Sequence, residues 1–148
     1  MEKNMEKYEA YKKMYEDLNK AMKYGFYYEA IFIEYAIFED RLRSLLKYAG
    51  LPAEKKGRAL TLVQKLNTIR TNEKFCDNFI RERLTSELLD SVEEWKDKRN
   101  KLIHNLANTP YTSDEVKVIA EEGYELLRVF KSKSQSIINR FKKNNNVI

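Results

Sequence analysis

The stretch that decides the fold is FYYEAIFIEYAIFEDRLRSLLKYA, residues 26–49. Its large apolar side chains recur at helical spacing and include Tyr27, Ile31, Phe38, Leu42, Leu45 and Leu46. This spacing predicts a helix, and so broad an apolar surface is typical of a helix that lies at the centre of a bundle or also contacts a partner. Gly50 and Pro52 follow it, and both favour a helix end.

Three further long helices are expected around this segment. Apolar residues at steps of three and four predict long helices over residues 2–24, about 83–106 and about 113–142, with a short helix at 59–69, a basic loop at 55–58 and a further turn at 75–80. Thr112 and Glu115 form a sequence capping box before the last helix. Four long helices joined by short connections, plus one short helix, predict an all-α, up-and-down bundle. We expect one domain over residues 1–148, with a frayed tail at 142–148.

The composition is that of a folded, helix-rich chain. Only 4 Gly and 2 Pro occur among 148 residues, and the net charge of +5 permits a polyanionic partner without identifying one. No apolar run approaches the roughly 20 residues that span a membrane, and the N-terminal segment lacks a signal-peptide core. Cys76 is the single cysteine, so no internal disulfide can form. We expect Cys76 to be a small buried group and the protein to be cytoplasmic.

The helix expected over residues 83–106 has one charged residue in its apolar line. The line runs through Leu88, Val92, Trp95, Arg99, Leu102 and Leu106. A guanidinium at such a position costs several kcal/mol unless it is paired or opens into a cleft. Arg99 is therefore a structural residue, extended to the surface or paired with an acid such as Glu39 or Asp40, or it is a functional one.

Two more polar residues lie beside Arg99. Asn100 follows it, and His104 lies one turn beyond Asn100, so at about 100° per residue both share one face. His104 is the only histidine, and a lone histidine on a helix more often has a structural role. One His and one Cys cannot build a zinc site, and no Gly-rich phosphate loop occurs, so we expect neither metal nor cofactor. In an enzyme, acid–base chemistry would take place at His104.

The segment Arg99-Asn100-Lys101-Leu102-Ile103-His104 resembles the R-x4-6-H motif of the HEPN (higher eukaryote and prokaryote nucleotide-binding) superfamily. In that family the residue after the Arg is typically polar and often Asn. The helix order is also similar, because the motif lies near the end of the penultimate long helix of a four- to five-helix bundle. Some members carry a Tyr two residues after the His, where this chain has Leu106. This departure argues against the toxins that are paired with nucleotidyltransferase antitoxins.

The resemblance implies a metal-independent endoribonuclease that works as a homodimer, with two motifs facing each other across a cleft. Attack by the ribose 2′-OH would leave a 2′,3′-cyclic phosphate and a 5′-hydroxyl. The implied catalytic residues are Arg99, which would hold the phosphate, His104, which would move a proton, and Asn100, which would orient either. Family members include toxins and antiphage or abortive-infection effectors. The implied partners are RNA, a second copy, and an antitoxin or regulatory protein, with no membrane.

Other interpretations stay open. Three lysines lie near the motif: Lys96, Lys98 and Lys101. They are either RNA-phosphate ligands or ordinary solvated side chains. The chain could instead be a non-catalytic, HEPN-like binding or scaffold protein in which Arg99 forms a structural pair. It could also be an unrelated bundle that binds a partner helix through the face of Tyr27, Ile31 and Phe38.

Overall fold

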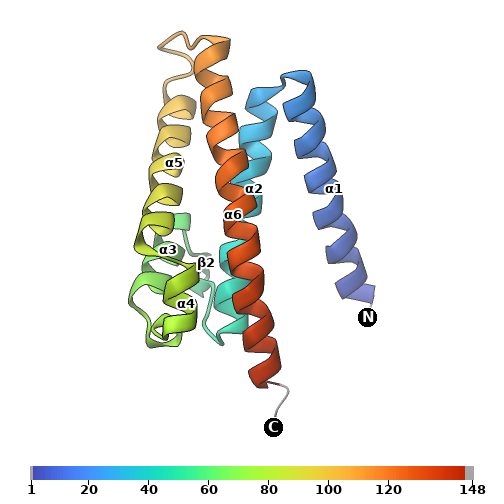
Figure 1. Ribbon diagram of the computed structural model, residues 1–148. Helices are drawn as coiled ribbons and strands as arrows, with labels where there is room; N and C mark the ends of the chain where they lie inside the picture. The colour runs from blue at the N-terminus through green and yellow to red at the C-terminus, as the bar shows by residue number, and fades with distance from the viewer. Residues whose placement is uncertain (1, 146–148) are drawn as a thin grey trace.

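The computed structural model describes residues 2–145, with side chains from residue 5 onward. The elements in order are α1 (Glu2–Tyr24), α2 (Tyr27–Tyr48), β1 (Glu54–Lys55), β2 (Arg58–Ala59), α3 (Leu62–Thr71), the 3-10 helix η1 (Glu73–Phe75), α4 (Asn78–Arg83), α5 (Ser86–His104) and α6 (Ser113–Asn145). The four long helices alternate in direction (Figure 1), which confirms the predicted all-α, up-and-down bundle. Within the described residues, no helix is both long and apolar enough to cross a bilayer.

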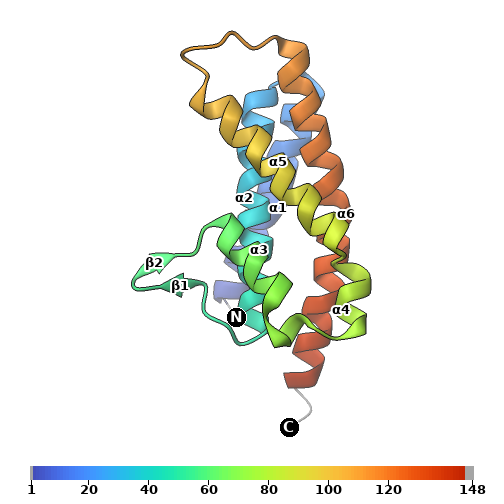
Figure 2. The same ribbon diagram turned by 90° about the vertical axis from the view of Figure 1, so that its left-hand side faces the viewer.

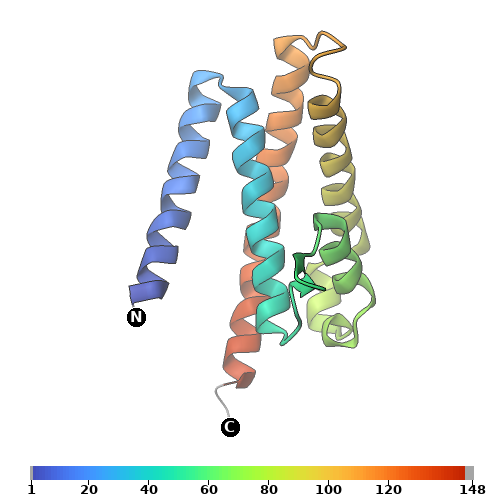
Figure 3. The same cartoon turned by 180° about the vertical axis from the view of Figure 1, so that it is seen from behind.

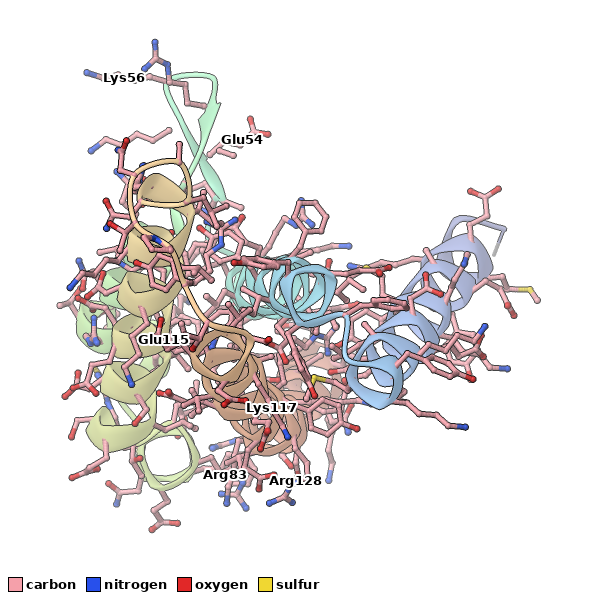
Figure 4. All side chains as sticks on the ribbon, turned by 90° about the horizontal axis from the view of Figure 1, so that it is seen from above. Glu54, Lys56, Arg83, Glu115, Lys117 and Arg128 are labelled. Atoms are coloured by element: carbon pink, nitrogen blue, oxygen red, sulfur yellow. The ribbon has the colours of Figure 1, made fainter. Side chains whose placement is uncertain are left out.

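The central pair of the bundle is α2 and α6, which pack closely along their length. Seen from above, α1 and α5 lie at opposite edges with α2 and α6 between them (Figure 4). The same order is visible from behind, where α1 and α5 stand at the two sides (Figure 3). Because α2 packs against α1, α3 and α6, it needs apolar residues over much of its surface, as its sequence indicated.

Three aromatic residues form the middle of the core. Phe38 of α2 lies 5.2 Å from Trp95 of α5 and 5.8 Å from Phe130 of α6, measured between ring centroids. All three side chains are fully buried. The Trp95 indole N–H donates a 2.9 Å hydrogen bond to the backbone carbonyl of Ile119, so its polar atom is satisfied inside the core. These contacts hold α2, α5 and α6 together at one level.

Side chains cap the helix starts where the chain turns. The Thr112 hydroxyl accepts a bond from the Glu115 backbone N–H at 3.2 Å, and the Glu115 carboxylate accepts one from the Thr112 N–H at 3.3 Å. This confirms the predicted capping box. At the end of α1, Gly25 has a φ of 78°, a left-handed conformation that glycine adopts without strain.

Several boundaries differ from the prediction. The expected basic loop at 55–58 is a hairpin, β1–β2, that projects from the bundle (Figure 2), with Lys56 and Gly57 both at positive φ in its turn. The helix expected from residue 83 is instead divided at Leu84, and α5 begins after Thr85, whose hydroxyl caps it.

Cys76 is exposed rather than buried, because it lies on the bend after η1. Helix α6 continues to Asn145, past the expected end near Lys142, and residues 146–148 of the expected frayed tail lie outside the described part.

The apolar face of α2 named in the partner-helix interpretation is covered within the chain. Ile31 and Phe38 are buried, and Tyr27 packs against the core. This face is therefore not free to receive a helix from another protein. The exposed apolar residues of α2 include Tyr28 and Phe32, which lie on a different side of the helix.

Gly123 of α6 permits the close approach of α5. A Cβ at this position would lie 2.7 Å from two ring atoms of Trp95 and would also touch the Glu34 carboxyl. Gly123→Ala should therefore lower the free energy of unfolding by about 1–2 kcal/mol, because overpacking outweighs the gain of about 1 kcal/mol in helix propensity. Urea unfolding measures this. Ser136→Ala, on the exposed face of the same helix, is the control and should retain wild-type stability. Equal stability of Gly123→Ala and wild type would contradict the packing described.

Candidate functional site on α5

Arg99 lies against α2 rather than in open solvent. Its guanidinium carbon is 3.9 Å from the centroid of the Tyr35 ring, and its Nη1 donates a 2.9 Å hydrogen bond to the Asn100 side-chain oxygen. The residue is half-buried. A planar guanidinium on an aromatic face is attracted by the electron density of the ring. Tyr35 and Asn100 therefore fix both the position and the orientation of the Arg99 cation.

The carboxylates expected as structural partners of Arg99 are engaged elsewhere. Glu39 accepts a 3.1 Å bond from Lys65 of α3. Asp40 pairs with Lys7, Arg41 and Arg43. Among the described residues no carboxylate forms an ion pair with Arg99, and its buried Nε has no hydrogen-bond partner. The structural alternative in which Arg99 forms an ion pair with Glu39 or Asp40 is therefore not the arrangement seen, and no carboxylate of the described residues lies within ion-pair distance of its guanidinium.

His104 is the last residue of α5 and is exposed. It lies one turn beyond Asn100, at the end of the bundle that also holds the α1–α2 turn (Figure 1). On an ideal helix the side chains of Arg99 and His104 leave the axis about 140° apart, with Asn100 between them. The structure thus brings Arg99 and Asn100 into contact and places His104 on the face next to Asn100, open to solvent.

The three lysines near the motif do not form one group. Lys98 pairs with Glu122 of α6 at 3.0 Å, which directs it to the α6 side of α5, away from the Tyr35 side. Lys96 is largely buried and lies 2.6 Å from the Asp97 carboxylate. Lys101 is exposed. The structure therefore separates Lys98 from the Arg99 side, and the prediction that these lysines contact RNA remains a prediction.

Exposed apolar side chains lie on the helix faces that carry Tyr35 and Arg99, and the sequence analysis did not assign them. Tyr28 and Phe32 lie two turns and one turn before Tyr35 on the same face of α2, and Ile103 lies one turn after Arg99 on α5. Phe32 is 68% exposed and Ile103 is 41% exposed. We call Tyr28, Phe32 and Ile103 the apolar rim. In the sequence, the α2 part of the rim could have been recognised from a second apolar line, Tyr28, Phe32 and Tyr35. This line lies about 90° around the helix from the buried one.

A buried carboxyl lies next to this site on the core side of α2. Glu34 is fully buried, and neither of its side-chain oxygens has a hydrogen-bond partner in the described part of the chain. It packs beside Gly123, in the space that also holds the Trp95 ring. Burial raises the pKa of Glu34 from 4.5 to about 9, because a charged carboxylate loses its hydration there. The side chain is therefore a neutral acid at neutral pH.

Glu34 should make the stability of the fold depend on pH. With a pKa of 4.5 in the unfolded chain and about 9 in the folded one, it binds a proton only in the folded state between these values. Stability should then fall as the pH rises through this window, by up to about 1.4 kcal/mol per pH unit. Urea unfolding at about pH 5 and about pH 8 measures this decrease.

The matched variants separate Glu34 from other titrating groups. Glu34→Met, an apolar replacement of similar length, should be more stable than wild type at the higher pH and should lose much of the pH slope. Glu29→Met, an exposed acid on the same helix, should keep the wild-type slope. The assignment fails if Glu34→Met retains the full wild-type slope.

Comparisons with models of known protein families, with curated proteins and with solved structures found no match. The candidate site is therefore defined by its own side chains and geometry. Its main elements are the Arg99–Tyr35–Asn100 contacts, the exposed imidazole of His104 and the apolar rim beside them.

Proposed function

We propose that the chain is a metal-independent, HEPN-type endoribonuclease that cleaves RNA at a site shared by two copies. The observation that carries this proposal is the unpaired, half-buried guanidinium of Arg99, held by Tyr35 and Asn100. Even partial burial of a cation without a paired anion has a desolvation cost. The presence of Arg99 in the apolar line of α5 is explained if a substrate phosphate supplies the missing negative charge.

The residues of the site match the chemistry of transesterification. A base removes the proton of the ribose 2′-OH, the 2′ oxygen attacks phosphorus, the bond to the 5′ oxygen breaks, and an acid protonates that oxygen. A histidine side chain can serve as base or acid near neutral pH. The Arg99 guanidinium stabilises the negative charge that develops on the phosphoryl oxygens. Asn100 and Tyr35 act as positioning residues because they hold that guanidinium in place.

A second copy of the chain completes this mechanism. Each chain has one histidine, so a reaction that uses one imidazole as base and another as acid requires two chains. The apolar rim lies at the same end of the bundle as His104 and exposes large side chains to solvent. Covering such side chains is favourable, and exposed apolar groups near a functional site are typical of an interface. A cytoplasmic toxin or antiphage effector, controlled by an antitoxin or other regulatory protein, is the cellular role that we propose.

The alternative is a HEPN-like binding or scaffold protein without catalysis. The contact of Arg99 with Tyr35 and Asn100 favours it, since the same contacts would stabilise α5 on α2 in a purely structural role. The two functions differ in what His104 does. An exposed histidine that only occupies the helix end contributes nothing to RNA cleavage, so its replacement separates them.

Cleavage of RNA in the presence of EDTA is the direct test. Wild type should yield fragments with 2′,3′-cyclic phosphate and 5′-hydroxyl ends, which end-labelling and mass spectrometry identify. His104→Ala should lower the rate by about 100-fold or more, as should Arg99→Ala, with little change in stability for the exposed His104. Lys117→Ala, at an exposed position on α6, is the control. No cleavage, or equal rates for wild type and His104→Ala, would reject the proposal.

The shared site predicts that dimerisation and activity are lost together. Phe32→Asp places a charge in the apolar rim and should produce a monomer that no longer cleaves RNA. Val118→Asp is the matched control, because Val118 is 63% exposed and lies on the side of α6 opposite to α2. Light scattering measures the mass of each variant. A wild type that is monomeric at micromolar concentration, or a monomeric variant with full activity, would exclude the shared site.

A further inference from the structure

A second group of cations surrounds a groove between α1, α2 and α6, toward the end of the bundle away from His104. The groove has a volume of about 490 Å³, and its lining includes Lys7, Arg41, Lys131 and Lys142. The ribbon of α1 diverges from α2 toward its N-terminal end, as both Figure 1 and Figure 3 show. The described residues that line this groove include no Asp or Glu.

Arg41 is the buried cation of this groove. Only 8% of the residue is exposed, its Nη1 donates a 3.1 Å bond to the Gln135 side chain, and its guanidinium lies 4.7 Å from the Tyr11 ring centroid. Its buried Nε has no partner. The nearby Asp40 carboxylate, 3.6 Å from Arg41, is shared with Lys7 and Arg43. One carboxylate thus serves three cations, which leaves positive charge in the wall of the groove.

The lysines from α6 are placed on aromatic rings rather than on acids. The Lys131 ammonium lies 4.2 Å from the Tyr15 ring centroid, and the Lys142 ammonium lies 5.0 Å from that of Tyr48. An aromatic ring attracts a cation but does not cancel its charge. By contrast, the groove on the outer face of α1 is lined by equal numbers of lysines and carboxylates. A groove beside the β1–β2 hairpin is also lined by cations without an acid, Lys55, Lys56 and Arg58, but all three are exposed. The groove between α1, α2 and α6 adds the buried Arg41 to two lysines that form no ion pair in the described part of the chain, so it is the more favourable place for an anion.

We propose that this groove binds a polyphosphate group, either inorganic or carried by a nucleotide. Four cations from three helices line the groove, and only Lys7 and Arg41 share a carboxylate, that of Asp40. The positive charge that remains matches a di- or triphosphate better than a single phosphate. A groove of this size encloses a small ligand, and the buried Arg41 can be reached by a phosphoryl group that enters it. This site lies apart from Arg99 and His104, and it stands independently of the proposed ribonuclease activity.

Calorimetric titration of the full chain with sodium triphosphate, ATP and adenosine tests the proposal. Triphosphate should bind wild type, with an affinity that decreases as salt is added. The double variant Lys131→Gln/Lys142→Gln should bind at least about tenfold more weakly. The control Lys133→Gln/Lys143→Gln removes two exposed lysines of the same helix that do not line the groove, and it should bind like wild type. Thermal melts check the fold, and triphosphate should raise the Tm of wild type and control only.

The ligand series distinguishes the sources of the phosphate chain. Equal affinity for triphosphate and ATP would assign the site to the phosphate chain alone, whereas tighter binding of ATP would add recognition of the nucleoside. Binding of adenosine alone would overturn the proposal. So would the absence of triphosphate binding at millimolar concentration, or equal binding by wild type and Lys131→Gln/Lys142→Gln. Loss of RNA affinity in that variant without any triphosphate binding would assign the groove to an RNA backbone and also overturn it.

Discussion

The packing of Trp95 on Gly123 is the contact on which the arrangement of α5 depends. The indole reaches the backbone of α6 because residue 123 has no side chain, and its N–H bonds the Ile119 carbonyl. A large planar side chain held at both its face and its edge fixes the rotation of its helix as well as its distance from the neighbour. Since Arg99 follows Trp95 by about one turn, this rotation also decides where the guanidinium goes.

The fixed rotation directs Arg99 toward α2, where the described part of the chain gives it no ion pair and the carboxylate of Glu39 is engaged by Lys65. Tyr35 supplies an aromatic face instead, and such a contact contributes about 0.5–2 kcal/mol without cancelling the charge of the cation. The residue before it, Glu34, points into the core as a neutral acid. Tyr35 thus contacts the Arg99 guanidinium with its ring, whereas the neighbouring Glu34 carboxyl lies on the core side of α2. This arrangement keeps the guanidinium available to an outside anion.

The sequence predicted the helices well because their periodicity and capping are local properties. The Thr112–Glu115 box and the placement of Arg99 on an inward-facing line follow from spacing alone. The break at Leu84 was missed, because the apolar pattern continues across it and only the Thr85 cap marks it. The β1–β2 hairpin was missed because its strands have two residues each. The contacts of the site could not be predicted, since Tyr35 lies 64 positions before Arg99 and Lys98 meets Glu122 only through the packing of α5 on α6.

Contacts between a cation and a tyrosine ring occur both at the candidate site and around the groove between α1, α2 and α6. Arg99 on Tyr35, Arg41 on Tyr11, and Lys131 on Tyr15 are all cations placed on tyrosine rings. A salt bridge removes charge from the surface, whereas a ring holds the cation in position and leaves its field largely intact. The net charge of +5 is therefore a poor guide to how this protein meets anions. What matters is that tyrosine rings position Arg99, Arg41 and Lys131, and that of these three only Arg41 also pairs with an acid. A phosphate can therefore become a counter-ion both at Arg99 and in the groove.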